Sequence, residues 1–472
     1  MTTKIFAVHF ARLNILRCGG IIGAIFMEAL MELAAAFIIF IMCVAVSLIL
    51  DISMLAPLLV GFVLFSALAV HKGFALKAVL KMAVGSLKES FIVVGILLLI
   101  GCLTGLWRSS GTVAYFVTLG VSVMPPSFFL LAAFLLSAVM SFAIGTSFGV
   151  TATAGVIIMS IAHAGGISPI PVAGAVLSGV YVGDRGSPAS SAANLVAAVT
   201  GTDVEKNIKI MLKSGAVPFV LCCVIYGILS VFYPMQSTDS QVLTELGEEF
   251  KLSWLCLFPA ILMIILPFCK VKVKWAMAID IVVSFVLAMV TQGAGFVDCF
   301  KTMLLGFEPQ NAALSTMLSG GGVKSMLTIC GILLLSGTYG GIFHGTGMLD
   351  GLSEKLIILR GKVGRFPVMV LLSFAVSIVF CNQTIGVIML NQLSECLYGT
   401  EDDERYSKMI DIENSVIVIA GLVPWCIACS VPLAMMNVGA AAVPLAFYLW
   451  LIPLCTAFSR KKLRDKRSIT EV

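Results

Sequence analysis

The sequence predicts an all-α polytopic membrane protein made of two inverted-topology repeats, with discontinuous helices and about 12–14 membrane segments. Hydrophobic residues make up 60% of the 472 residues and charged residues only 12%, and the mean hydropathy is +1.08. A soluble domain carries about twice that share of charged residues. The composition therefore predicts a membrane protein, and a long internal repeat predicts the duplication.

The apolar runs give the predicted membrane segments in chain order. Each run approaches or reaches the roughly 20 residues that span a bilayer. The runs are 29–50, 54–70, 91–106, 127–144, 148–162, 170–183, 211–233, 253–269, 276–291, 323–345, 366–380, 410–429 and 431–457. Several are short or interrupted by Gly, Pro and hydroxyl residues, so we expect some of the helices to be discontinuous.

Two stretches of the chain carry nearly the same apolar sequence. Gly85 and Gly321, 236 positions apart, each begin a Gly-x-x-Lys that is followed by Gly-Ile-Leu-Leu-Leu and further glycines. The spacings agree through Gly111 and Gly347. A chance match between two Leu-rich segments is the alternative, but the agreement of the Gly and Lys positions favours duplication of an ancestral half. Transporters with duplicated halves place the substrate at the repeat interface near the bilayer midplane.

The placement of basic residues predicts the orientation of the halves. The C-terminal tail is basic, and the positive-inside rule places it in the cytoplasm. Its basic residues are Arg460, Lys461, Lys462, Arg464, Lys466 and Arg467. Lysines between 72 and 88 place that loop inside as well, whereas the matching loop, 292–322, has few basic residues and is predicted outside. The two halves therefore run in opposite directions.

These observations divide the chain and predict its location. The divisions are a cytoplasmic N-terminal extension (1–26), a first transmembrane repeat (27–235), an external linker (236–252), a second transmembrane repeat (253–457) and a basic cytoplasmic tail (458–472). We expect a multi-pass protein of the cytoplasmic (inner) membrane, with both termini cytoplasmic and the lipid bilayer as its surroundings. A homodimer is left open.

Several function classes are disfavoured by the sequence. It contains no Walker loop and no dinucleotide fingerprint, so we expect neither ATP-driven transport nor a cofactor. Basic residues do not gather on a folded face, so nucleic acid is not an expected partner. No resident metal is expected, since Cys426 and Cys429 lie in an apolar run where cysteine packs as a small hydrophobe. An intramembrane hydrolase using Ser319 or Ser325 with His344 lacks a nucleophile elbow.

The run that is richest in polar residues within apolar sequence is Gly183–Asn194. Polar groups at membrane depth are costly unless they function or are paired, and unwound backbone there must line a cavity or be buried in protein. We predict Asp184 as an ion- or proton-coupling carboxylate and Arg185 as its charge partner. The predicted cation-binding groups of this run are Ser187, Ser190, Ser191 and Asn194. An ordinary loop with a surface ion pair is the alternative.

Three further polar positions complete the predicted site. Glu413 is the second predicted coupling acid, followed by Asn414 and Ser415 as ligands; a helix cap is the alternative. Residues 143–150 and 380–387 occupy matching places in the halves and contain Gly breaks, which is the best sequence pointer to a binding site. The predicted ligands there are Thr146, Ser147, Asn382, Gln383 and Thr384. Hydroxyl groups that only pack helices are the alternative.

We also expect residues 183–194 to meet Asn382–Thr384 near the membrane centre. Trp107 and Arg108 follow the first repeated helix. They either close the translocation path or anchor the helix at the interface.

These motifs resemble the NhaC-type sodium/proton antiporters of the ion-transporter superfamily. The motifs are Gly183–Ser190 with Asn194–Ala197, Glu413–Ser415 with Leu422–Trp425, Gly105–Thr112 and Gly145–Ser147. The resemblance covers about residues 27–457. It implies two inverted repeats and secondary active transport, in which members exchange sodium for protons or carry malate, lactate or amino acids with those ions.

The chain departs from this family at three places. Arg185 stands where Lys is usual, which keeps the charge. Ser190-Ser191-Ala192-Ala193-Asn194 stands where the family reads Ser-Asp-Thr-Thr-Asn, so an acid and two hydroxyls are missing. Cys426 replaces a usual Asn. The leading prediction is a sodium/proton antiporter working by alternating access, and the runner-up is a sodium- or proton-coupled transporter of a small organic anion or amino acid.

Overall fold

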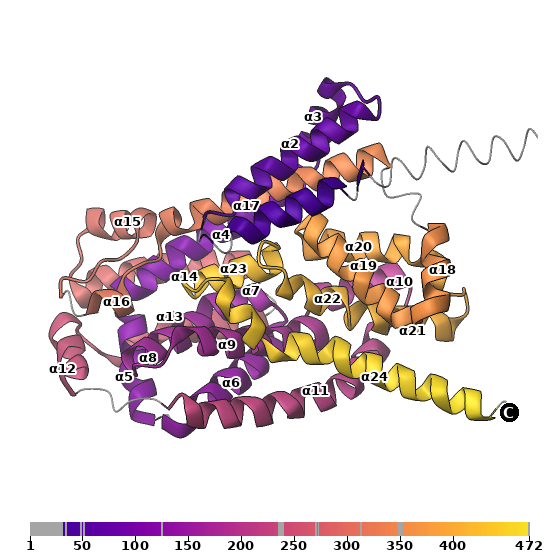
Figure 1. Cartoon of the computed structure of the whole chain (residues 1–472). Coiled ribbons are helices and arrows are strands. Elements are labelled where there is room, and N and C mark those ends of the chain that lie inside the picture. Colours follow the sequence, from indigo (N-terminus) through magenta and orange to yellow (C-terminus); the bar gives the residue numbers. More distant parts are fainter. Residues whose placement is uncertain are drawn as a thin grey trace, which may run out of the picture.

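The computed structural model describes residues 32–470, except 34, 48–49, 51, 124–125, 235–239, 270, 272, 312–313 and 348–352. The predicted extension 1–26 lies outside the described residues. Regular structure in the described residues is helical, apart from one isolated bridge between Phe307 and Gly320. Figure 1 shows the helices packed into one bundle, with α2 (Leu55–His71) and α3 (Leu76–Gly85) projecting beside one end of α17 (Gly322–Thr346). The all-α prediction is confirmed.

The remaining helices follow in chain order. In the first half they are α4 (Leu87–Ser109), α5 (Thr112–Val123), α6 (Phe129–Ile144), α7 (Ser147–Val150), a π-helical segment (Thr151–Gly155), α8 (Val156–Ala164), α9 (Pro169–Gly186), α10 (Ser191–Thr200) and α11 (Val204–Phe232). In the rest of the chain they are α12 (Ser240–Glu249), α13 (Phe258–Phe268), α14 (Val273–Gln292), α15 (Phe296–Leu305), α16 (Ser315–Leu318), α18 (Ser353–Val363), α19 (Arg365–Phe380), α20 (Gln383–Leu393), α21 (Asp402–Glu413), α22 (Val416–Ile419), α23 (Ile427–Met435) and α24 (Phe447–Thr470).

Membrane-length helices occur in both halves of the described chain. Four are long and apolar enough to span a bilayer: Ser147–Ala164, Val204–Phe232, Lys274–Gln292 and Gly322–Phe343. Two bent pairs, Val94–Ser109 with Thr112–Leu119 and Asp402–Leu422 with Ile427–Met435, turn by 65° and 50° at their breaks. Six shorter apolar helices accompany them. The chain is therefore a polytopic membrane protein with the discontinuous helices that its sequence predicts.

The two repeated helices, α4 and α17, cross in opposite directions. A Cβ added to Gly101 would lie 2.7 Å from the carbonyl oxygen of Gly322 and 3.1 Å from Met326. At Gly337, the counterpart of Gly101 in the second repeat, a Cβ would lie 2.3 Å from the hydroxyl of Ser90, which is the counterpart of Met326. The contacts are reciprocal, so a local two-fold axis relates the two helices, which is the arrangement expected of inverted repeats.

The same offset relates two helix breaks, one in each half. Gly145 ends α6 with a φ of 75°, and Cys381 ends α19 with a φ of 52°. The next residues, Thr146 and Asn382, cap α7 and α20 with their side chains. Matching residues 143–150 with 380–387 places Gly145 opposite Asn382, so this prediction is one residue out of register. The helix ends and caps correspond although the residue types at them differ.

The polar run Gly183–Asn194 is less unwound than predicted. Helix α9 continues through Gly186, and only residues 187–190 separate it from α10. The Ser187 hydroxyl donates a 2.6 Å hydrogen bond to the carbonyl of Phe142. A Cβ on Gly145 would come within 2.4 Å of the Ala189 backbone. The break between α9 and α10 therefore packs directly on the break between α6 and α7.

Candidate ion-coupling site

Asp184 lies where breaks from both halves converge. It occupies the last turn of α9 and is 5% exposed. Its Oδ2 accepts a 3.3 Å hydrogen bond from Nε2 of Gln383, the first residue of α20. Ser147, the first residue of α7, also interacts with this carboxylate. The expected contact between residues 183–194 and 382–384 is confirmed, and its place near the membrane centre stays a prediction.

Glu413 is a second buried acid close to the same point. It ends α21 and is 1% exposed. Neither of its carboxylate oxygens has a hydrogen-bond partner among the described residues. The charges of Arg185 and Asp184 both act on it. Glu413 is therefore a buried carboxylate whose hydrogen-bonding capacity is free for a proton or a cation.

Arg185 supplies the positive charge of this centre but is not bonded to either acid. Arg185 forms no ion pair with any described residue. Its guanidinium instead donates hydrogen bonds to four neutral groups: Asn414 Oδ1 (2.5 and 3.1 Å), Ser214 Oγ (2.6 Å), the Met211 carbonyl (3.1 Å) and the Tyr448 hydroxyl (3.4 Å). These contacts use all five N–H donors of the side chain. A surface ion pair is excluded, because Asp184 and Arg185 are both buried.

Other predicted ligands have structural partners instead. Thr146, Asn382 and Ser190 cap helices α7, α20 and α10. The Ser415 hydroxyl donates to the carbonyl of Asp411 at 2.6 Å, within its own helical turn.

Three more predicted ligands lie on exposed positions. These are Ser191, Asn194 and Thr384. The Asn194 amide donates to the carbonyls of Ser190 (2.7 Å) and Pro188 (3.0 Å), so it closes the break locally. Fewer side chains meet at Asp184 than the sequence predicts as ligands. Most of the predicted hydroxyl and amide groups instead form hydrogen bonds with free backbone groups at the helix breaks.

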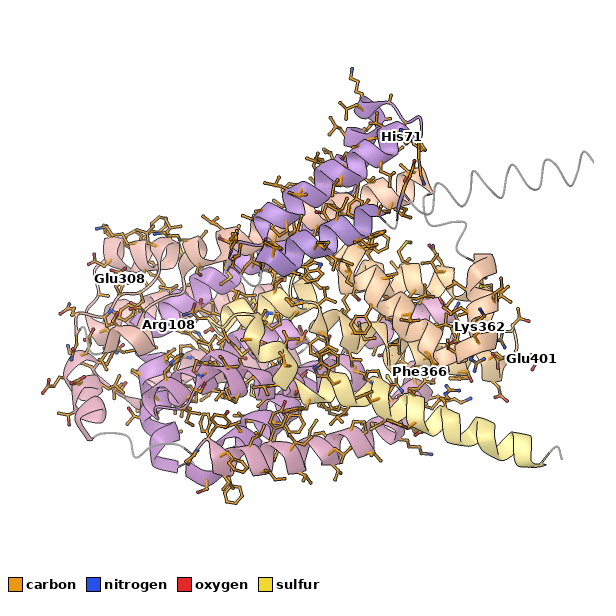
Figure 2. The ribbon with its side chains drawn as sticks, viewed as in Figure 1. His71, Arg108, Glu308, Lys362, Phe366 and Glu401 are labelled. Atoms are coloured by element: carbon orange, nitrogen blue, oxygen red, sulfur yellow. The ribbon has the colours of Figure 1, made fainter. Side chains whose placement is uncertain are left out.

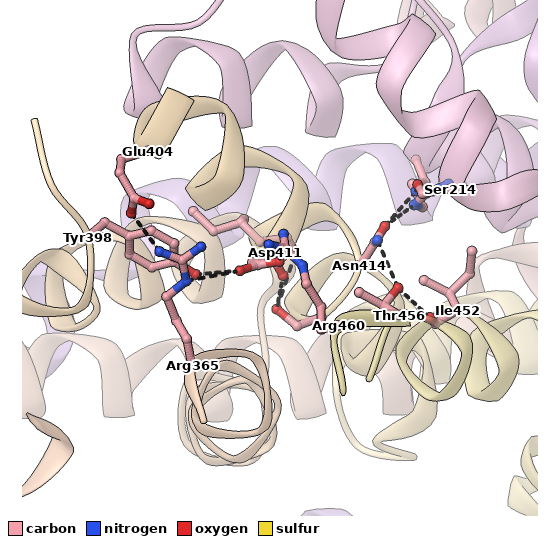
Figure 3. Close-up of polar contacts among 12 residues, drawn as sticks. Ser214, Arg365, Tyr398, Glu404, Asp411, Asn414, Ile452, Thr456 and Arg460 are labelled. Carbon is pink, nitrogen blue, oxygen red and sulfur yellow. Dashed lines mark hydrogen bonds and ion pairs between the residues drawn. The ribbon is translucent and has the colours of Figure 1, made fainter. Parts of the chain in front are cut away.

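A separate ionic cluster lies two residues before Glu413, around Asp411. Asp411 accepts from Arg460 at 2.7 Å and from the Tyr398 hydroxyl at 2.8 Å, and Arg365 lies 3.8 Å away (Figure 3). Arg365 also pairs with Glu404 at 2.5 Å. Figure 3 shows this cluster tying α19, α21 and α24 together.

Trp107 and Arg108 are buried in protein, so the interpretation as lipid-interface anchors is wrong. Figure 2 shows Arg108 within the bundle, whereas Lys362 and Glu401 lie at its edge. The Arg108 Nη1 donates to the Thr104 carbonyl at 2.8 Å, one turn earlier in α4.

A wide acidic cavity opens beside the end of α4. Its volume is about 700 Å³, and it is lined by the carboxylate residues Glu245, Glu248, Glu249, Asp298 and Glu308 together with polar and apolar neighbours. No Lys or Arg stands among its described lining residues. A cleft lined by one sign of charge concentrates counter-ions, here cations.

Sequence reasoning missed the groups that hold Arg185. Ser214 and Tyr448 lie in apolar helices without a motif, and Met211 contributes only its carbonyl. No local signal identifies them, because a lone hydroxyl in an apolar helix is common.

Broken helices that meet at buried carboxylates define the class of the molecule as a secondary transporter. The sequence profile of the Na+/H+ antiporter family matches residues 6–193 and 179–458, and the chain belongs to this family.

Individual relatives agree over most of the chain. The Na+/H+ antiporter NhaC of Bacillus subtilis is 26% identical over 433 residues, covering 89% of this chain and 96% of the relative. The malate-2H+/Na+-lactate antiporter of the same organism is 27% identical over 386 residues, covering 80% and 82%. NhaC of Alkalihalophilus pseudofirmus is 26% identical over 368 residues, covering 76% and 80%.

Proposed function

We propose that this chain exchanges sodium for protons across the cytoplasmic membrane by alternating access, with Asp184 and Glu413 as the coupling acids. One observation carries the proposal: Asp184 and Glu413 are buried at one centre with Arg185, and Glu413 has no hydrogen-bond partner among the described residues. Family membership and the two NhaC relatives favour sodium and protons as the exchanged ions.

The charges of the centre explain how exchange would occur without ATP. One arginine and two ionised acids leave one net negative charge in the membrane, which is costly. A single sodium ion or a single proton restores neutrality, whereas binding both leaves an excess positive charge. Proton and cation therefore compete, and each enters as the other leaves. Hydroxyl, amide and carbonyl oxygens at the helix breaks would complete the cation's shell.

Arg185 acts in this scheme as a positioning residue. Its five donors all bind neutral acceptors. Its positive charge therefore acts on both acids at a distance, without forming an ion pair with either one. The same saturation argues against the runner-up function, since Arg185 has no donor left for the carboxylate of an organic anion. The absence of the family acid at Ser191 is only a small argument against sodium as the exchanged ion, because Ser191 is exposed at the start of α10.

The proposed orientation of the protein in the membrane follows from the charges of its loops. The Asp411 cluster, with Arg365 and Arg460, would face the cytoplasm together with both termini. The acidic cavity would face outward, because Glu249 accepts backbone bonds from Gln310 (2.6 Å) and Asn311 (2.9 Å), which joins the two loops predicted as external. The proposed halves, 27–235 and 253–457, would superpose about an axis in the membrane plane.

The test is proton movement in inverted membrane vesicles after pulses of sodium, potassium, malate, lactate and amino acids. We expect sodium alone to release the pre-formed proton gradient, and the double variant Asp184→Asn/Glu413→Gln to abolish that response. A response to malate, lactate or an amino acid in the absence of sodium would replace sodium/proton exchange with the runner-up function.

A further inference from the structure

A further buried acid lies far along the chain from Asp184 and Glu413, in the middle of α14. Asp280 is 0% exposed, and its Oδ2 accepts a 2.8 Å hydrogen bond from Nε1 of Trp107 in α4. Its Oδ1 has no partner among the described residues. The hydroxyl of Ser284, one turn further along α14 and also 0% exposed, is likewise without a partner there. Residues four apart share one face of a helix, so both orphan groups face the same side.

We propose that Asp280 is a second proton-binding site, in which a neutral carboxylic acid is held against α4 by the indole of Trp107. The proposal concerns binding at Asp280 and does not depend on which ions the transporter exchanges.

The surroundings of Asp280 favour its neutral form. Other side chains of α14 point outward and are large and apolar, among them Val282 (63% exposed) and Val290 (75% exposed). Asp280 therefore lies on the inner face of a lipid-facing helix, near its centre. An isolated carboxylate there, without a counter-charge, is strongly disfavoured unless a proton or a cation neutralises it.

Charged and titratable groups on the elements packed against Asp280 do not neutralise it. Those elements are α4, α13 and α15, and α13 contributes no titratable side chain. The described candidates are Lys88, Cys102 and Arg108 on α4, Asp298, Cys299 and Lys301 on α15, and Lys274 on α14 itself. None of them makes an ion pair or hydrogen bond with Asp280 in the described part of the chain. Trp107 is neutral and can only donate.

The available oxygens favour a proton over a metal cation. A hard cation takes about six oxygen ligands or more. At this site the described residues offer only Asp280 Oδ1 and the Ser284 hydroxyl as unpartnered side-chain oxygens. A proton needs one carboxylate oxygen and no shell of ligands.

Trp107 makes the site observable. An indole N–H bonds an ionised carboxylate more strongly than a neutral carboxylic acid. Loss of the proton from Asp280 therefore changes the hydrogen bond of Trp107 and with it the indole emission. The chain has five tryptophans, so replacing Trp254, Trp275, Trp425 and Trp450 by Phe leaves Trp107 as the reporter.

The first experiment is a pH titration of Trp107 emission in the purified full chain. We expect a single transition that is absent in Asp280→Asn and retained in Asp184→Asn, Glu413→Gln and the exposed-acid control Asp298→Asn. A flat titration in the Trp107-only protein, or an unchanged one after Asp280→Asn, overturns the proposal. Sodium that reproduces the change at constant pH, through Asp280, would make the ligand a cation and also overturn it.

The second experiment needs no substitution. Dicyclohexylcarbodiimide reacts with protonated carboxyl groups in apolar surroundings, and mass mapping of the treated wild-type chain locates the modified residue. We expect Asp280 to be labelled at low pH and to lose labelling as pH rises. Absence of label on Asp280 at every pH, with labelling elsewhere in the membrane segments, contradicts the proposal.

Discussion

Two buried acids stand two residues apart on α21 and have opposite surroundings. Asp411 has a bonded arginine, a tyrosine hydroxyl and a second arginine within 3.8 Å, whereas Glu413 has no hydrogen-bond partner among the described residues. Residues i and i+2 on a helix do not face each other. Asp411 therefore faces α19 and α24, and Glu413 faces the centre that contains Asp184. The paired acid holds helices together, and the unpaired acid is free to bind an ion.

The largest expected effect is on stability, at Asp411. Asp411→Ala leaves Arg365 and Arg460 without their common partner, and breaking a buried ion pair costs about 3–5 kcal/mol. We expect a marked fall in melting temperature in detergent, while protein that remains folded still exchanges ions. A melting temperature equal to that of the wild type would mean that the Asp411 cluster does not hold α24.

The next effect is on transport, at Asp184. Asp184→Asn keeps the shape of the side chain but removes the carboxylate that we propose alternates between proton and cation. We expect exchange in inverted vesicles to fall at least about tenfold, or about 1.4 kcal/mol in the rate-limiting free energy, with the melting temperature nearly unchanged. Unchanged coupled exchange would move the principal coupling acid from Asp184 to Glu413.

A smaller and different effect is expected at Glu413. Glu413→Gln loses no hydrogen bond, so stability should not fall. The amide cannot bind or release a proton, so Asp184 alone is left to do so, and we expect exchange to weaken by about threefold and its pH profile to flatten. The measurement is the sodium-dependent rate across a range of pH. A wild-type profile with full rate would assign Glu413 no part in coupling.

The smallest effect is expected at an exposed acid of the same helix. The Asp402 side chain is 86% exposed and pairs with Arg405 at 3.6 Å. Asp402→Asn should change stability by less than about 0.5 kcal/mol, because exposed pairs contribute little. Exchange should equal that of the wild type, which makes this variant the matched control. A loss of exchange here would show that removing any acid from α21 impairs the protein.

Much of the architecture follows from local sequence. The 236-residue offset of the glycines predicts two equivalent helices, and α4 and α17 cross with reciprocal contacts at Gly101 and Gly337. Asp184 and Glu413 can be recognised in the sequence because an acidic residue within an apolar membrane segment costs free energy. Helix breaks are also local, since they depend on Gly, Pro and side chains that cap free backbone groups.

The sequence by itself determined the membrane class, the repeated glycine pattern, the approximate position of the breaks and the identity of the two central acids, because composition, spacing and backbone preference are properties of neighbouring residues. The tertiary structure alone decided which acids are paired. Asp184 meets Gln383, Arg185 meets Asn414, and Trp107 meets Asp280 across separations of 199, 229 and 173 residues. No periodicity connects such distant positions, so only packing in three dimensions distinguishes the bonded Asp411 from the free Glu413.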